Sequence, residues 1–364
     1  MKIAFVALTG TYEIDQIGGT DSYLRRLSEE LVRHGHDVEW LFYGKEKEST
    51  TSKFGIKIKN FYSFSLLWQY SLEGHFDKTI IGYIKPLDRL SLFFKKLFGE
   101  KPKALYSLVF FYPDNLVKKI VRAMDVFFTG YDAVICASER LQHFNKIFSK
   151  KSFWLPPIIP RLYFNIGYAK LEKGIINEGP RVPAIFLGRL DPRKGINEII
   201  KLIKDPRLTE KVNWTVSGIY IAEDKGNINA LRTLKAMDGI EFHLEDRKKF
   251  SADVDNRVAN FFLNNIFFLQ PYTKLATTVD LPLLILEAQA AGCIVLTSLP
   301  NVLDRYLVGK SSAFQDSYVD NTAKYLSHFQ WQPHKTLMTK DDLINLESKY
   351  SADVVYRSFI NILG

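Results

Sequence analysis

The 364-residue sequence has little cysteine and no long uninterrupted hydrophobic run. Its two cysteines, Cys136 and Cys293, lie within the apolar segments "DAVICAS" and "GCIVLTS". This placement favours buried, reduced thiols over a disulfide bond, and reduced thiols are typical of proteins in the cytoplasm. The start "MKIAFVALTG" also lacks the hydrophobic core of a signal peptide. We therefore expect a cytoplasmic protein.

Only one segment, 281–300 ("LPLLILEAQAAGCIVLTSLP"), is apolar enough to be considered as a membrane span. Glu287, Gln289 and Gly292 interrupt it, and it divides naturally into a helix and a strand. The sequence also has no internal repeat and no low-complexity tract. These absences exclude membrane-spanning, repeat and disordered proteins as interpretations.

The composition is that of a soluble globular protein, with 46% hydrophobic and 24% charged residues. The length exceeds the size at which one hydrophobic core keeps growing, so two domains are expected. The net charge of +9 indicates an acidic partner, which could be a nucleotide, an anionic membrane or a nucleic acid. The excess is uneven, because residues 78–122 hold ten Lys or Arg and three acids.

The first half of the chain predicts a doubly wound domain. A continuous apolar strand at 2–8 is followed by a glycine-containing loop, a helix at 21–35 and a strand at 37–44. Thr20 or Asp21 can cap the helix, and Gly35 ends it. Helices are then expected in "YSFSLLWQYSL" and "DRLSLFFKKLFGEKPK", and strands in "KALYSLVFF" and "DAVICAS", after which Ser138 can cap a further helix.

The second half repeats this alternation. The proline content and mixed polarity of 156–174 predict a linker, and strands then alternate with helices from 183 to 298. The tail predicts a single closing helix. We expect an α/β protein with Rossmann-like domains at 1–165 and 180–344, and with a final helix at about 345–364 packed back on the first domain.

The segment "GRLDPRKG" (188–195) stands between a predicted strand and a predicted helix. Ligands bind at the carboxyl ends of strands in open α/β sheets. Gly188 allows close backbone approach, Arg189 has a planar fork that suits phosphate oxygens, and Lys194 adds a charge near the helix N–H groups. The segment therefore predicts an anion site. The alternative is a solvated basic turn in which Asp191 pairs locally.

A second candidate site residue, Glu287, lies in an otherwise apolar predicted helix. A buried carboxylate is costly unless it accepts hydrogen bonds, and the hydroxyls of a nucleotide ribose would donate them. The alternative is a glutamate that reaches solvent or caps a neighbouring loop.

Four segments together carry a resemblance to a known family. They are "IGGTDSYLRRLSEELVRHGHDV", "YDAVICASERL", "GRLDPRKG" and "DLPLLILEAQAAGCIVLTS", and their order and spacing cover nearly the whole chain. The chain resembles the retaining GT-B glycosyltransferases of family 4, which include sucrose synthases, mannosyltransferases and lipid-sugar transferases. This resemblance implies two Rossmann-like domains facing across a cleft, the first binding the acceptor and the second the nucleotide sugar.

The resemblance also implies residue roles and a reaction. Arg189 and Lys194 would hold the donor diphosphate, Glu287 the ribose, and the Gly18–Gly19 loop the donor phosphates. The reaction is transfer of a hexose, with retention, from a UDP- or GDP-linked sugar to a glycan or lipid-linked acceptor, without a metal or other cofactor. The expected catalytic residues are Arg189, Lys194, Asp280 and Glu287, and the expected substrate-binding residues are Gly18, Gly19, Thr20, Gly188, Leu244, Pro282 and Leu283.

Two departures from the family pattern keep alternatives open. Val279 stands where the family has its first glutamate, so either Asp280 substitutes with a one-residue shift or the sugar contact is lost. No histidine lies between His75 and His143, and "FFYPDN" with Tyr112 occupies the region of the family histidine. These departures favour a catalytically inactive GT-B subunit as the second interpretation. A DNA-modifying glycosyltransferase is the third, although no nucleic-acid motif is present and no nucleic-acid partner is expected.

Residues 87–103 predict an interfacial helix. Leu90, Phe94, Leu97 and Phe98 fall near one face, and the lysines at 95, 96 and 101 lie around it, a pattern typical of contact with anionic lipid. This places the protein peripherally at the inner membrane face. The alternative is a core helix with a solvated basic edge. The metal-like triplet "DVD" (253–255) precedes a predicted helix, where aspartate is a common cap, so no metal site is expected.

Overall fold

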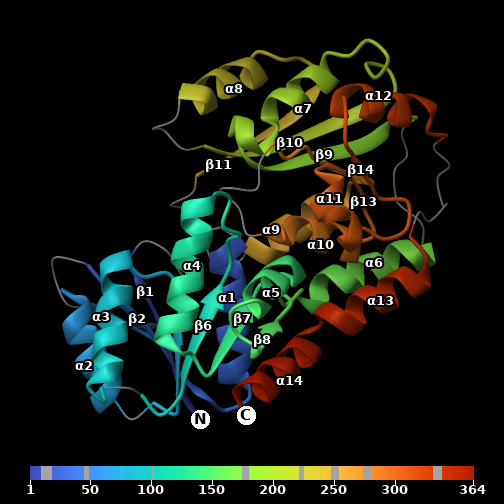
Figure 1. Cartoon of the computed structure of the whole chain (residues 1–364). Helices are drawn as coiled ribbons and strands as arrows, with labels where there is room; N and C mark the ends of the chain where they lie inside the picture. Colours follow the sequence, from blue (N-terminus) through green and yellow to red (C-terminus); the bar gives the residue numbers. More distant parts are fainter. Residues whose placement is uncertain are drawn as a thin grey trace. The chain divides into compact units, whose positions relative to one another are not determined.

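The computed structural model describes residues 1–9, 19–44, 49–74, 76–100, 102–173, 180–220, 225–246, 254–273, 280–330 and 338–364. The chain forms two compact units (Figure 1). The first contains Met1–Ile158, Thr278–Leu281 and Ala352–Gly364, and the second contains Ile159–Thr277 and Pro282–Ser351. The expected site residue Gly18, Val279 and the first aspartate of "DVD" lie outside the described residues.

The first unit is built on an eight-stranded sheet. All neighbouring strands are parallel except β3 and β4, which form an antiparallel hairpin. Its strands, in spatial order, are β3 (Ser49–Lys53), β4 (Ile56–Phe61), β2 (Asp37–Tyr43), β1 (Lys2–Leu8), β5 (Lys78–Ile81), β6 (Leu105–Val109), β7 (Ala133–Cys136) and β8 (Ser152–Trp154). The central part of β1 is buried, as expected for a strand that is covered on both faces of the sheet.

Among the described residues of this unit, six helices cover the sheet. They are α1 (Gly19–Arg33), α2 (Phe64–Glu73), α3 (Pro86–Leu97), α4 (Leu116–Thr129), α5 (Glu139–Lys146) and α14 (Ala352–Leu363). Helix α1 packs against β2 and α14. Helices α2 to α5 contribute to one core cluster, which includes Trp68, Leu92 and Val126. Ser138 caps α5 by accepting a hydrogen bond from the Leu141 N–H, which confirms the predicted cap.

The second unit contains a six-stranded parallel sheet. Its strands, in spatial order, are β11 (Ile240–Asp246), β10 (Val212–Tyr220), β9 (Val182–Arg189), β12 (Phe267–Gln270), β13 (Ile294–Ser298) and β14 (Ser312–Phe314). Counted along the chain, this is the third, second, first, fourth, fifth and sixth strand, which is the order of a Rossmann fold. The chain therefore adds strands toward one edge of the sheet from β9 to β11 and toward the other edge from β12 onward, so the strand order reverses between β9 and β12.

Helices cover both faces of this second sheet (Figure 1). One face carries α7 (Ile196–Ile203), α8 (Lys225–Lys235) and α12 (Tyr318–His328), whose apolar residues join a common core. Four more helices pack on one another: α6 (Arg161–Lys173), α9 (Val254–Leu263), α10 (Leu283–Ala290) and α13 (Lys340–Tyr350). The short elements are the 3-10 helices η1 (Pro192–Lys194) and η2 (Asp304–Tyr306) and helix α11 (Pro300–Leu303).

Several predicted elements are wrong. The predicted linker contains helix α6, because Tyr163, Phe164 and Ile166 after the prolines are buried. The predicted closing helix is two helices, α13 and α14, which the extended backbone at Ser351 separates. Among the elements with no counterpart in the prediction are strands β3, β4, β5, β8 and β14 and helices α4 and α12.

Both cysteines are free and buried, as predicted. In the part of the chain that the structure describes, no helix combines the length and the apolar character needed to cross a membrane.

Candidate functional site: an anion site at the switch point of the second sheet

The reversal between β9 and β12 brings two loops together at the carboxyl ends of the strands, which is where open α/β sheets bind ligands. Strand β9 ends at Arg189, and its register aligns Gly188 with Gly218 of β10. Gly218 is in turn aligned with Leu244 of β11. The expected site residues Gly188 and Leu244 thus lie at the same end of the sheet, and the Leu244 side chain is 44% exposed.

The turn after β9 is ordered by Asp191. Its carboxylate accepts a 2.8 Å hydrogen bond from the Arg193 N–H and two further bonds, of 3.0 and 2.6 Å, from the Nε and Nη2 of the same arginine. Burial alone would raise the pKa of Asp191, but the hydrogen bonds from Arg193 outweigh burial and lower it. Asp191 therefore pairs locally, as the alternative interpretation expects, and its partner Arg193 is one of the three cations of the segment.

Lys194 differs from Arg193 because it is directed into the protein. Only 7% of Lys194 is exposed, and its ammonium nitrogen lies 4.8 Å from the centre of the Tyr272 ring. Burial, followed by the nearby positive charge of Arg189, lowers the pKa of Lys194 to about 7. A buried cation with another cation beside it is the electrostatic setting that an anion would relieve.

Gly195 holds the two loops of the switch point in contact. It has a φ of +83°, and a Cβ atom at this position would lie 2.0 Å from the Pro271 carbonyl oxygen. The Thr273 N–H donates a 3.1 Å hydrogen bond to the Arg193 carbonyl, which ties the loop after β12 to the turn after β9. Glycine is required here both for the left-handed backbone and for the close approach.

Helix α7 begins directly after this glycine, which has no side chain to cap it. Its first N–H groups and the partial positive charge of its N-terminus therefore lie beside Lys194. A cavity of about 390 Å³ lies next to the same loops, and its lining residues include Tyr272, Thr273, Ser298 and Glu198. The Glu198 Oε2 atom is buried and has no hydrogen-bond partner among the described residues, so it marks the polar side of this cavity.

Glu287 lies on α10, where almost every residue is buried. The residue is 3% exposed, so the alternative in which it reaches solvent is wrong. Pro282 occupies the N-cap position, and Leu283, the first residue of the helix, is 5% exposed. Gln289 on the same helix has a structural role, because its amide binds the Tyr306 carbonyl and the Val308 N–H at 2.9 and 2.7 Å.

Asp280 belongs to the first unit and has partners that the sequence did not indicate. Its carboxylate forms an ion pair with Arg140 and accepts a hydrogen bond from the Ser138 hydroxyl. The Asp280 N–H donates to the Phe110 carbonyl at 3.0 Å. The Arg140 guanidinium in turn lies 4.0 Å from the centre of the Tyr112 ring, in the region where the family histidine is missing. Both carboxylate oxygens of Asp280 are therefore used within the first unit.

The remaining expected site residues and the candidate metal ligands lie in the first unit. Gly19 and Thr20 form the first turn of α1 and are half-buried, so the helix begins before the predicted cap at Thr20. Among the described residues, one group could offer three ligand atoms to a metal ion: Glu30, His34 and Asp353. In this group His34 stacks on Tyr356 with ring centres 3.7 Å apart, and Glu30 pairs with Arg33.

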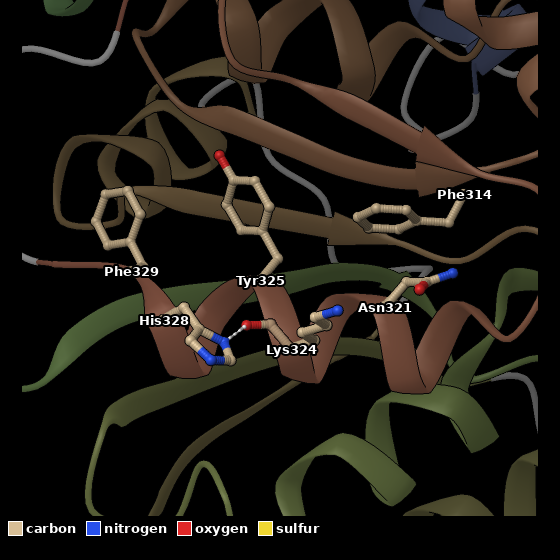
Figure 2. Close-up of a pocket in the computed structure, with 6 residues that line it drawn as sticks. All are labelled: Phe314, Asn321, Lys324, Tyr325, His328 and Phe329. Carbon is tan, nitrogen blue, oxygen red and sulfur yellow. Dashed lines mark hydrogen bonds between the residues drawn. The ribbon is translucent and has the colours of Figure 1, made fainter.

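A larger pocket of about 590 Å³ lies on the same unit as the switch point but at the outer strand β14 (Figure 2). Phe314, Tyr325 and Phe329 form its aromatic walls, and Lys324 is the single cation in its lining. The carboxyl ends of β9 and β12 have two cations, Arg189 and Lys194, where this pocket has Lys324, and two loops meet there. We therefore assign the candidate site to the switch point and not to this pocket.

Comparison with known proteins identifies the fold. No family model matches the chain, and no curated protein does. Solved structures match it over nearly the full length of both chains. Sucrose-phosphate synthase from Thermosynechococcus elongatus is 13% identical with a TM-score of 0.69 and covers 99% of this chain and 98% of its own. The Anabaena protein HepE in complex with UDP is 12% identical with a TM-score of 0.70, and the match covers 100% of this chain and 99% of HepE.

A glycosyltransferase from Rickettsia africae is 11% identical with a TM-score of 0.72 and covers 100% of this chain and 97% of its own. Other HepE structures contain UDP-glucose or UDP with glucose. The chain thus has the GT-B fold, with two Rossmann-like domains, and this confirms the predicted fold class.

Proposed function

We propose that the protein is a retaining glycosyltransferase that moves a hexose from a nucleotide sugar to an acceptor. The observation that carries this proposal is the buried Lys194 at the switch point, next to Arg189 and the start of α7, in a chain with the GT-B fold. The HepE complexes with UDP and UDP-glucose support a nucleotide-sugar donor, because HepE has a similar fold.

In this proposal the diphosphate of the donor binds at Arg189 and Lys194. As the bond from the sugar to the diphosphate breaks, negative charge develops on the leaving phosphate, and fixed positive groups stabilise it. These residues and the α7 N-terminus supply the charge without a metal ion. Gly18, Gly19 and Thr20 would contact the donor phosphates, as the resemblance implies.

The Glu287 carboxylate would accept hydrogen bonds from the ribose hydroxyls, which is the role that the resemblance implies for it. Gly188, Leu244, Pro282 and Leu283 would line the remainder of the donor site. The base would be uracil or guanine, so the donor is UDP- or GDP-linked. The acceptor would be a glycan or a lipid-linked sugar.

The proposed setting is the cytoplasmic face of a membrane, with the protein bound peripherally. The support is helix α3, which exposes the apolar side chains of Leu90, Phe94 and Leu97, as expected from the sequence. The alternative of a core helix with a solvated basic edge fits α3 less well, because among the side chains that the structure describes on this helix Leu92 alone is buried.

One observation favours a second function, which is nucleotide-sugar binding without transfer. The Asp280 carboxylate is engaged by Arg140 and Ser138, so it is a poor substitute for the glutamate that contacts the sugar in the family. A chain that keeps the phosphate and ribose groups but lacks the sugar contact would bind a donor and release it unchanged.

The two functions are separated by following UDP-glucose and GDP-mannose during incubation with the protein, with and without EDTA. We expect slow hydrolysis, in which water accepts the sugar and the nucleoside diphosphate leaves, at the same rate in EDTA, and proton NMR should show the sugar in its original anomeric configuration in the first product. Binding without release would show an inactive GT-B protein. Failure of both nucleotides to bind would overturn the proposal. Activity that EDTA abolishes and magnesium restores would overturn the part of it that excludes a metal ion.

A further inference from the structure

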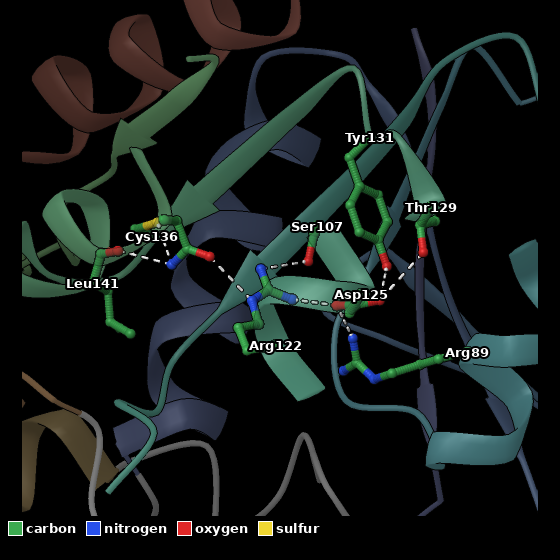
Figure 3. Close-up of polar contacts among 9 residues, drawn as sticks. Arg89, Ser107, Arg122, Asp125, Thr129, Tyr131, Cys136 and Leu141 are labelled. Atoms are coloured by element: carbon green, nitrogen blue, oxygen red, sulfur yellow. Dashed lines mark hydrogen bonds and ion pairs between the residues drawn. The ribbon is translucent and has the colours of Figure 1, made fainter. Parts of the chain in front are cut away.

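Helix α4 has polar residues on the side that faces the sheet and apolar residues on the side that faces away from it, which is the reverse of an ordinary core helix. Its polar residues Arg122, Asp125 and Thr129 face the sheet (Figure 3). The Arg122 Nη2 donates to the Ser107 hydroxyl at 3.2 Å, and its Nε donates to the Asn145 side chain at 3.1 Å. The inner face of α4 is thus held by hydrogen bonds to β6 and α5.

Asp125 is the centre of this inward network. It is paired with Arg122 and with Arg89 of α3, and it accepts hydrogen bonds from the hydroxyls of Tyr131 at 3.0 Å and Thr129 at 3.3 Å. Four donors satisfy a carboxylate that is almost fully buried, so the network is complete without any further partner. The orientation of α4 is therefore fixed by these polar residues together with Val126, which lies in the core cluster.

The apolar face of α4 consequently points away from the sheet. Its residues recur every three or four positions, as one face of a helix requires, and they are 44–71% exposed. They are Leu116, Val117, Ile120, Val121, Met124, Phe127 and Phe128.

Helix α3 extends this surface. The two helices pack side by side, and the rings of Phe93 and Phe128 join them with centres 5.4 Å apart. The exposed apolar residues of α3 and its end are Leu87, Leu90, Phe94, Leu97 and Phe98. We call these residues and those of α4 the α3–α4 apolar face. Exposed apolar side chains gathered in this way mark an interaction surface.

Lysines border the α3–α4 apolar face. Lys118 and Lys119 lie in the first turn of α4, where Lys118 is exposed and paired with Asp114, and Lys95 of α3 is paired with Glu100. Lys85 is exposed beside the start of α3. An apolar stripe with lysines at its edge is the pattern of a surface that enters the boundary between headgroups and acyl chains.

We propose that the α3–α4 apolar face docks on an anionic lipid membrane, with its leucine and phenylalanine side chains among the acyl chains and its lysines at the headgroups. The proposal extends the peripheral location given above, and it adds α4, which the sequence did not indicate. It does not require that the protein transfers a sugar. A second copy of the chain fits less well, because a two-fold interface would bring two positively charged rims together.

The test is flotation of the full-length protein with vesicles of phosphatidylcholine, alone or mixed with phosphatidylglycerol. We expect the protein to float with the anionic vesicles at low salt, and less at high salt, because charge attraction is screened. The combined variant Val117→Glu and Phe127→Glu changes two residues of α4 that are about 70% exposed. Its partition onto anionic vesicles should fall by more than about tenfold, since two apolar groups no longer enter the lipid.

The matched control is Tyr62→Glu with Ile147→Glu. It adds the same charge at two similarly exposed positions of the first unit that lie outside the α3–α4 apolar face. The control should float like the wild type, and both variants should keep the wild-type circular dichroism and UDP affinity, which separates this proposal from the proposed function.

Three results would overturn the proposal. The wild type could remain in the soluble fraction with anionic vesicles at low salt, or the control could lose as much binding as the α4 variant. The wild type could instead form a dimer that the α4 variant abolishes, without binding vesicles, and this would show that a second copy covers the face.

Discussion

The Lys194 ammonium nitrogen lies 4.8 Å from the centre of the Tyr272 ring, so a cation from the loop after β9 rests on an aromatic ring from the loop after β12. This contact stabilises a charge that burial otherwise opposes. It also places the charge at the point where the two halves of the sheet diverge. The pKa of about 7 makes Lys194 a group whose charge depends on pH near neutrality.

Nucleotide binding should therefore take up a proton above neutral pH. Without a ligand, Lys194 is mostly protonated below pH 7 and mostly neutral above it. A bound diphosphate favours the protonated form and raises the pKa, so binding at pH 8 should take up close to one proton and binding at pH 6 almost none. Calorimetry of UDP or GDP binding in buffers with different ionisation enthalpies measures this number. Equal uptake at both pH values would mean that Lys194 does not meet the phosphates.

Turnover should depend on the same residue. Lys194→Ala removes a positive group from the leaving diphosphate, and loss of one such group lowers kcat by on the order of 100-fold. Lys204→Ala is the control, because Lys204 caps the far end of α7 and is exposed. Rates of nucleoside diphosphate release from a saturating donor give the comparison. A Lys194→Ala enzyme with the wild-type kcat would remove this residue from the chemistry.

The close approach at Gly195 gives a prediction about stability. Gly195→Ala must accommodate both a positive φ and a Cβ atom 2.0 Å from the Pro271 carbonyl oxygen. Gly239→Ala is a matched control, since Gly239 has a φ of +76° and no heavy atom within 4 Å of its Cβ position. The control should lose about 1 kcal/mol in the free energy of unfolding, and Gly195→Ala should lose clearly more. Urea denaturation measures both, and equal losses would show that the loop moves aside.

Asp280→Asn tests whether this residue contacts the sugar or only Arg140. If the role is structural, the variant should lower the free energy of unfolding by about 1 to 3 kcal/mol, because Arg140 and Ser138 lose a charged partner. The KM for the donor should stay at its wild-type value. A large fall in kcat at unchanged stability would instead assign Asp280 to the sugar, in agreement with the expectation from the sequence.

Glu287→Gln should weaken binding of the bare nucleoside diphosphate. A hydrogen bond to a charged partner contributes about 1.5 to 3 kcal/mol, which corresponds to roughly ten- to a hundredfold in affinity. The matching experiment uses a nucleotide that lacks the ribose 2′-hydroxyl or 3′-hydroxyl. The wild type should discriminate against that nucleotide, and the variant should not. Unchanged affinity in a folded variant would place Glu287 in a purely structural role.

The elements around the switch point were predictable because local signals agree there. The strand before Gly188 is a continuous apolar run, proline and glycine shape the turn, and α10 is apolar along its length. Helix α6 was missed because the prolines before Arg161 resemble a linker, although they only precede the helix. Helix α4 was missed because hydrophobic patterning assumes that apolar residues face inward, whereas Arg122 and Asp125 do so here.

Long-range partners also escaped the sequence analysis. Arg140 lies in a segment that carries the family resemblance, but nothing in the sequence links it to Asp280, which follows 140 positions later. The lowered pKa of Lys194 likewise depends on burial that only the folded sheet creates.

The central claim is that the switch point of the second sheet binds a nucleoside diphosphate. Titration calorimetry of UDP and GDP into wild type, Lys194→Ala and Lys204→Ala at pH 6.5 tests it most directly. We expect one site per chain for at least one of the two nucleotides, an affinity that falls by about tenfold or more in Lys194→Ala, and wild-type affinity in Lys204→Ala. The claim is contradicted if neither nucleotide binds the wild type, or if Lys194→Ala binds as tightly as the wild type.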